Sequence, residues 1–169
     1  EFPAPGGKGL GEGDLPVLGV PEGKYLAQAS DEGLAAFGRH IKKLEQAGYT
    51  VRRIRMFDEI ETINHRHRQM IAAEFAEEQK EWFERYRGLY RPRTAELILN
   101  GQQVNIEDLD RARKACLSLR KYIADRQVPS GIDLWISPPA TGDAPEGIQT
   151  TGDPIMNLPW TNVGLPTIT

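Results

Sequence analysis

The 169-residue chain has little of several features that mark particular classes of protein. It holds a single cysteine, Cys116, which excludes an internal disulfide and fits a reducing compartment. The formal charge of −3, with both signs mixed along the chain, lacks the basic excess that nucleic-acid binding requires. No apolar run approaches the roughly 20 residues that cross a bilayer, and no signal segment begins the chain. These absences lead us to expect a soluble, cytoplasmic protein without nucleic-acid or membrane partners.

What is present is typical of a globular domain. Apolar residues make up 39% of the chain and charged residues 27%, so there is enough apolar surface to build a core. Residues 1–14 are rich in glycine and proline and have almost nothing to bury, which predicts a flexible lead-in. Residues 15–169 are expected to form the folded part.

The first part of this region has the pattern of a βαβ unit. Apolar runs at 15–20 and 50–54 predict two strands, and helical spacing over 31–47 predicts a helix between them. Ser30 stands at the N-cap position of that helix, and Gly48 stands just past its end. A strand, a helix and a strand in this length predict a parallel pairing.

The middle of the chain is predicted to be helical. Helical spacing favours one long helix over 58–89, a short helix over 94–100, and a last helix that Asn105 caps. A further strand is predicted at 132–136, followed by a loop and a final strand at 166–169. The fold class is therefore α/β, with a partial mixed sheet, a βαβ unit and several helices.

Two local patterns that suggest catalytic or nucleotide-binding loops fail on geometry. Ser118 and Lys121 have the spacing of a Ser-x-x-Lys nucleophile, but they lie deep inside a predicted helix and lack the companion motifs. The stretch from Gly19 to Lys24 is one residue too short for a phosphate loop. We therefore expect neither a Ser-x-x-Lys nucleophile nor a phosphate-binding loop in this chain.

Metal binding is also not expected. His65 and His67 are two residues apart on a helix, so their side chains point in different directions. His67 and Glu74 share a face, but they are about two turns apart, too far to hold one ion. These two side chains are interpreted as hydrogen-bonding groups at the edge of the core. Alternatively, Glu74 faces a polar site completed by another part of a larger protein. Cys116, on an apolar helix face, is interpreted as core.

The C-terminal stretch TTGDPIMNLPWTNVGLPTIT, residues 150–169, combines several unusual features. It follows the strand-and-proline segment IDLWISPP and is dense in glycine, proline and polar residues around one tryptophan. In these residues the chain resembles the amidase-signature family, whose corresponding loop has the form TGdp…n.pWt..G.P. The resemblance extends back over LPVLGVPEGKYL at 15–26, AFGRHIKKLEQAGYTVRRI at 36–54 and the helical segment that starts at His67.

The resemblance implies the fold of a C-terminal part of an amidase, which hydrolyses carboxylic amides through a serine acyl-enzyme. It implies no cofactor. That family uses a serine in a Gly-Ser-rich loop, a second serine in a cis peptide and a lysine, all of which precede the matched region. The serines of this chain are Ser30, Ser118, Ser130 and Ser137, and none of them lies in such a loop. No catalytic residue is therefore assigned, and the 169 residues alone are expected to be inactive.

Within the loop at 150–166, the resemblance implies a wall of the substrate pocket. Apolar walls are assigned to Met156, Trp160 and Ile155, and hydrogen-bonding amides to Asn157 and Asn162. Glu74 is a further pocket candidate. The alternative is that Trp160 and Ile155 simply pack beneath the strand that follows.

Two other functions stay open. The parent protein could be the amidase-like subunit of a tRNA-dependent amidotransferase. Alternatively, the chain could be a non-catalytic module that presents the charged face of the helix at 58–89 to a partner. Because the predicted strands would lack part of their sheet, we also expect self-association through exposed sheet edges.

Overall fold

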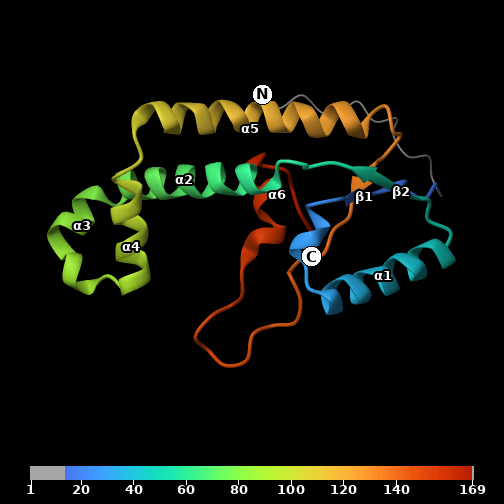
Figure 1. The fold of residues 1–169 in the computed structure, drawn as a ribbon, viewed down its shortest axis with the longest axis horizontal. Helices are drawn as coiled ribbons and strands as arrows, with labels where there is room; N and C mark the ends of the chain where they lie inside the picture. Colours follow the sequence, from blue (N-terminus) through green and yellow to red (C-terminus); the bar gives the residue numbers. More distant parts are fainter. Residues whose placement is uncertain (1–13, 169) are drawn as a thin grey trace. The chain divides into compact units, whose positions relative to one another are not determined.

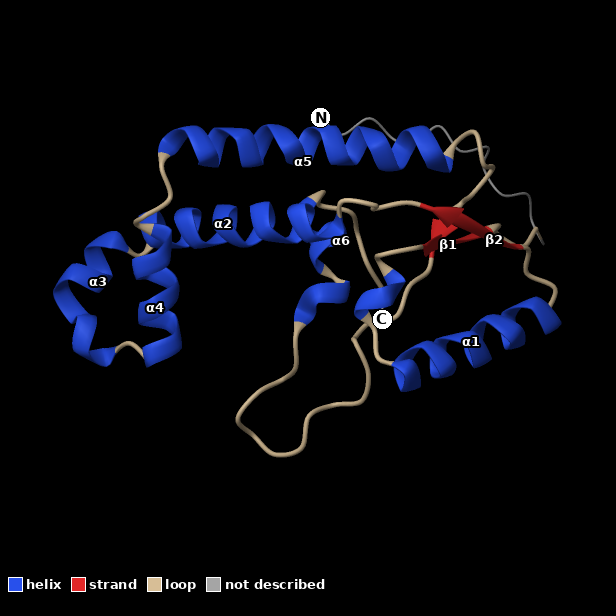
Figure 2. Ribbon diagram, in the orientation of Figure 1, coloured by secondary structure: helices blue, strands red, loops and turns tan. Residues whose placement is uncertain are grey.

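The computed structural model describes residues 14–168 (Figures 1 and 2). The predicted lead-in at 1–14 lies outside the described residues apart from Asp14, as does Thr169 at the end of the last predicted strand. The chain divides into two compact units. The first comprises the residues up to Ile60 and from Arg120 on, and the second is Glu61–Leu119. Each unit is described by itself.

A three-stranded sheet is the centre of the first unit. Its strands are β1 (Leu18–Glu22), β2 (Val51–Arg55) and β3 (Leu134–Trp135), in the order β2-β1-β3. Leu18 lies opposite Val51 on one side and Leu134 on the other, and both pairings are parallel. The βαβ unit is therefore confirmed. The prediction of a mixed sheet is wrong for the described strands, because both neighbours of β1 return to it through long connections rather than hairpins.

Helix α1 (Asp31–Gln46) connects β1 to β2 after a short 3₁₀ turn at Leu26–Gln28. Ser30 caps it as predicted, since its Oγ accepts a hydrogen bond from the Gly33 backbone N–H at 3.1 Å. Gly48, just past the C-terminal end, has φ +94°, the left-handed conformation that glycine adopts without strain. Ile41 is the fully buried residue of this helix.

The strands predicted nearer the C-terminus are shorter than expected. The segment at 132–136 pairs with β1 through backbone hydrogen bonds from Asp133 to Val17 and from Ile136 to Gly19, but the regular strand β3 is only Leu134–Trp135. The strand predicted at 166–169 is wrong for residues 166–168, which are exposed and form no strand. A strand needs a hydrogen-bonding neighbour, and the described residues offer none there.

The single long helix predicted at 58–89 is also wrong. The chain forms α2 (Ile60–Glu78) and α3 (Lys80–Tyr86), with a 3₁₀ turn at Arg87–Leu89. The interruption lies at Gln79, whose side-chain Oε1 accepts a hydrogen bond from the Tyr90 hydroxyl at 2.7 Å. The break lets the chain fold back, so that Phe83, Ala76 and Ile98 form one buried cluster. Burial of these apolar side chains against one another favours the bend over a straight, exposed helix.

Helix α4 (Pro92–Gly101) begins earlier than the predicted 94–100, because Pro92 at its first position needs no hydrogen-bonded N–H. Gly101 is the last residue of the helix rather than the residue after it. A Cβ atom at Gly101 would overlap the backbone carbonyl of Ala72, so α4 lies against α2 there with no space for a side chain.

Helix α5 (Ile106–Gln127) follows. Its predicted cap is confirmed, because the Asn105 Oδ1 accepts a hydrogen bond from the Asp108 backbone N–H at 2.7 Å. It is not the last helix. A 3₁₀ turn at Pro154–Met156 and the short helix α6 (Leu158–Asn162) lie in the segment predicted to be a loop. Pro159 permits α6 because it stands in the first turn. Among the helices of the described region, none is long and apolar enough to span a membrane.

Candidate functional site

The candidate site of the first unit lies where its parallel strands end. Tyr25 follows the carboxyl end of β1, Phe57 follows that of β2, and Ser137 follows that of β3. Because parallel strands point the same way, these three residues come from one edge of the sheet. In open α/β sheets this is the edge at which ligands bind. Trp160 of α6 joins the group.

The Tyr25 hydroxyl is the polar centre of this group. It donates a hydrogen bond to the Met156 carbonyl oxygen at 2.8 Å and accepts one from the Trp160 Nε1–H at 2.9 Å. Burial raises the pKa of Tyr25 above its ordinary value, although side-chain hydrogen bonds with Ser137 and Trp160 partly oppose the rise. The hydroxyl therefore stays protonated and works as a fixed donor and acceptor that holds the C-terminal segment.

The indole of Trp160 is packed among other aromatic rings. It meets Tyr25 edge-on at 6.0 Å between centroids, Phe57 edge-on at 5.4 Å, and Trp135 at 6.2 Å. Such edge-to-face pairs add to the stabilisation that comes from burial alone. The four rings belong to four different segments, so the cluster ties the end of the chain to all three strand ends.

Phe57 has an unusual backbone conformation for its type. Its φ is +61°, in the left-handed region that costs energy for a side chain of this size. Two contacts hold it there: its backbone N–H donates to the Tyr122 hydroxyl at 3.2 Å, and its ring is buried against Tyr25 and Trp160. A strained, fully buried aromatic residue at a sheet edge indicates that the position of this ring is tightly specified.

The proline-rich segment after β3 is fastened to α1. The backbone N–H of Ser30 donates to the Thr141 carbonyl oxygen at 2.6 Å, and a Cβ at Gly142 would come within 2.6 Å of the Ser30 Oγ. The Asn157 side-chain amide then donates to the Pro139 carbonyl oxygen at 2.9 Å. These hydrogen bonds give the loop a defined course despite its lack of regular structure.

The structure brings four of the five sequence-predicted pocket residues into one segment of the first unit. Met156 is fully buried and Trp160 is 5% exposed, whereas Asn157 is exposed and Asn162 half-buried. Glu74, the fifth, belongs to the second unit, where its Oε1 lies 2.9 Å from the Arg113 Nε in a partly exposed ion pair. A role for these five residues in substrate binding stays a prediction.

The second unit contains two groups that could carry chemistry, His67 and Cys116. His67 is 3% exposed, and neither ring nitrogen has a hydrogen-bond partner within the described residues. Burial, with the Arg68 charge second, lowers its pKa, so the ring is neutral at pH 7. Burial and then the Glu74 charge raise the pKa of the Cys116 thiol, which disfavours a reactive thiolate. Within residues 14–168, no group of three or more His, Cys, Asp or Glu side chains could hold a metal ion.

Sequence reasoning missed Tyr25 and Phe57. Their hydrogen bonds and ring contacts join residues far apart in the chain, and no local pattern marks them. The available signal was indirect: both are large aromatic residues a few positions after a predicted parallel strand, where the sheet edge gathers side chains.

The fold is similar to that of a solved protein. The crystal structure of an amidase superposes with a TM-score of 0.76 over 92% of this chain, at 20% sequence identity. The fold is amidase-like. The chain spans 38% of the length of that amidase. No family model matches the sequence, and no curated protein sequence matches it significantly.

Proposed function

We propose that this chain is the part of an amidase that shapes the substrate pocket while the reactive groups lie outside these 169 residues. The observation that carries the proposal is the likeness to an amidase structure over 92% of the chain. The loop at 150–166 and its resemblance to the amidase-signature pattern support it independently. The reaction would be hydrolysis of a carboxylic amide through a serine acyl-enzyme.

The residues described here would act by positioning. The Tyr25 hydroxyl, bonded to Met156 and Trp160, fixes the segment that carries Trp160 against the sheet edge. Met156 and Trp160 are buried and would support the apolar wall of the pocket from behind, while the more exposed Asn157 and Asn162 would offer amide groups to the substrate. A pocket of this kind is mostly apolar with a few polar groups, which matches this set.

The proposal gives no catalytic role to the serines of this chain. Ser137 is the serine nearest the site, and its side chain is hydrogen-bonded with the buried Tyr25 hydroxyl. That hydroxyl has a raised pKa and cannot serve as a base near neutral pH. A serine nucleophile needs a base within hydrogen-bonding reach, and the Tyr25 hydroxyl bonded to Ser137 is not one.

The test is an activity assay on the longer protein that contains this sequence. We expect it to hydrolyse simple carboxylic amides or aryl anilides without an added metal or cofactor, and to lose this activity after treatment with a serine-directed fluorophosphonate. Absence of hydrolysis across short, long and aromatic acyl amides, in a protein shown to be folded, would refute the proposal.

A further inference from the structure

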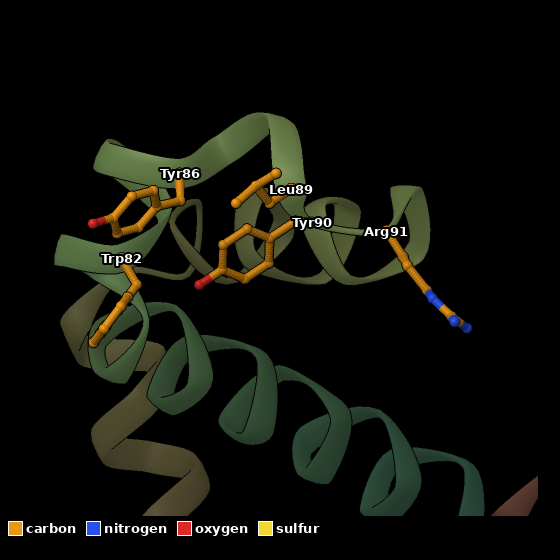
Figure 3. A pocket seen from close by; sticks show the side chains of 5 residues that line it. All are labelled: Trp82, Tyr86, Leu89, Tyr90 and Arg91. Atoms are coloured by element: carbon orange, nitrogen blue, oxygen red, sulfur yellow. The ribbon is translucent and has the colours of Figure 1, made fainter.

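A surface of the second unit exposes aromatic residues that the proposed amidase function does not use. Trp82 is 62% exposed, Tyr86 37% and Leu89 82%. Together with Tyr90 and Arg91 they line a hollow of about 450 Å³ (Figure 3). The Trp82 and Tyr86 rings lie 5.7 Å apart at 32°. We name Trp82, Tyr86, Leu89, Tyr90 and Arg91 the aromatic patch. Large apolar side chains gathered on a surface mark an interaction site more often than scattered ones do.

The two ends of the aromatic patch carry opposite charges. Trp82 also borders a second hollow, which is lined by Glu77, Glu78, Lys80, Glu81 and Glu84. Arg91 lies at the other end of the patch, beyond Leu89 and Tyr90 (Figure 3). In the described part of the chain, neither Arg91 nor any of these glutamates forms an ion pair. The charges at both ends are therefore available to a partner.

We propose that the aromatic patch is a dimer interface that binds a second copy of the same chain. In a twofold-symmetric contact, each residue of the surface meets the residue on the opposite side of the axis in the other copy. A rotation about the middle of the patch sets Arg91 of each copy against the acidic end of the other, with the aromatic side chains between them. The order of the two ends and the aromatic part between them, where Arg85 lies over the Tyr86 ring, is thus complementary to itself.

The arrangement of charges argues against a partner of one sign. A basic peptide would be attracted by the glutamates but repelled by Arg91. An anionic lipid surface would be attracted by Arg91 but repelled by the glutamates. Tryptophan, tyrosine and arginine are also the residues that most often dominate the binding energy of protein interfaces. The inference concerns the surface of these 169 residues, outside the candidate site, so its failure would leave the proposed amidase function untouched.

Sedimentation equilibrium of the 169-residue chain tests the proposal. We expect a reversible monomer–dimer equilibrium that Leu89→Glu weakens by at least about tenfold, because the substitution buries a charge in the contact. The matched control is Leu117→Glu, which changes a similarly exposed leucine (70%) of the same unit and should leave the dissociation constant unchanged. Far-UV circular dichroism checks that both variants keep the fold.

Charge reversal separates this interface from association through sheet edges. Arg91→Glu alone, and Glu78→Arg with Glu81→Arg, should each weaken the dimer by about tenfold, since like charges would face each other. Combining all three substitutions should restore the wild-type dissociation constant. The proposal is overturned if the wild-type chain is monomeric at all concentrations, including the case in which it binds basic peptides or anionic vesicles instead. The proposal is also overturned if Leu89→Glu leaves the dissociation constant of the dimer unchanged. It is overturned as well if the three combined charge reversals do not restore the wild-type dissociation constant.

Discussion

The indole N–H of Trp160 donates a hydrogen bond to the Tyr25 hydroxyl at 2.9 Å, joining two buried residues 135 positions apart in the sequence. The same hydroxyl donates to the Met156 carbonyl oxygen. One phenol thus holds the C-terminal segment to the end of the first strand, and the course of the proposed pocket loop depends on it.

Tyr25→Phe removes the hydroxyl that forms hydrogen bonds with both Trp160 and Met156. The Trp160 N–H and the Met156 carbonyl would each be left buried without this hydrogen bond, and we expect a loss of about 1–3 kcal/mol in the free energy of unfolding. Urea denaturation measures it. Tyr49→Phe is the control, because the Tyr49 hydroxyl makes no hydrogen bond within the described residues. Equal urea midpoints for both variants and the wild type would contradict the role of the Tyr25 hydroxyl in holding the C-terminal segment.

Truncation of Trp160 distinguishes a pocket wall from a purely structural role. In the longer amidase that we propose, Trp160→Ala should reduce kcat/KM for long or aromatic acyl amides by about 1–3 kcal/mol of transition-state binding, and much less for acetamide-sized ones. Since the ring is buried, we also expect a loss of stability of about 3–5 kcal/mol.

Trp160→Phe is the companion variant, because it keeps an aromatic ring and removes the N–H that Tyr25 accepts. The measurements are kcat/KM for a short and a long acyl amide, per folded molecule, together with the melting temperature. If activity falls equally for both substrates while the melting temperature drops, Trp160 is core only.

Two glycines in helices should respond oppositely to alanine. At Gly101 a Cβ would overlap the Ala72 backbone, so Gly101→Ala should destabilise the protein by about 1–3 kcal/mol. At Gly38, inside α1, no atom lies within 4 Å of the added Cβ. Gly38→Ala should therefore stabilise by about 0.5–1 kcal/mol, through the better helix propensity of alanine. Thermal unfolding of both variants tests this, and a neutral Gly101→Ala would show that α2 and α4 are not in close contact.

The stability of the chain should depend on pH through His67. Its pKa is lowered in the folded state, so below the ordinary value near 6.5 the unfolded state binds more protons than the folded one. The contribution of neutral His67 to the free energy of unfolding is therefore fully present above pH 6.5. It is lost as the pH falls from there toward the lowered pKa of the folded state. His67→Gln should flatten this dependence, whereas His65→Gln, at an exposed position, should not. The free energy of unfolding, measured between pH 7 and 5.5, is the test. Parallel pH curves for the wild type and His67→Gln would contradict the assignment of this pH dependence to His67.

Local signals in the sequence were enough to predict part of this fold. The caps at Ser30 and Asn105 are decided within one helical turn, and the parallel pairing of β1 with β2 follows from the strand–helix–strand pattern. The bend at Gln79 could not be predicted, because the apolar spacing continues through it. The bend depends on the contacts of Phe83 and Tyr90 with residues elsewhere in the unit.

The candidate site was predicted less completely than the fold. Composition and resemblance pointed to the loop that holds Met156 and Trp160, but the partners of these residues lie more than a hundred positions away. Phe57 adopts its strained backbone only because Tyr122 and the aromatic cluster compensate for it, and no sequence pattern records such compensation. Helix α6 was missed because Pro159 inside it and Gly152 and Gly164 on either side of it resemble the residues of a loop.

The central claim is that these 169 residues shape a pocket whose nucleophile lies elsewhere in a longer protein. Mass-spectrometric mapping of a serine-directed fluorophosphonate on that longer protein tests it most directly. The account predicts one labelled serine, outside this sequence, with loss of amide hydrolysis in proportion to labelling, and neither labelling nor turnover by the 169-residue chain alone. Stoichiometric labelling of Ser30, Ser118, Ser130 or Ser137 that abolishes activity would contradict it.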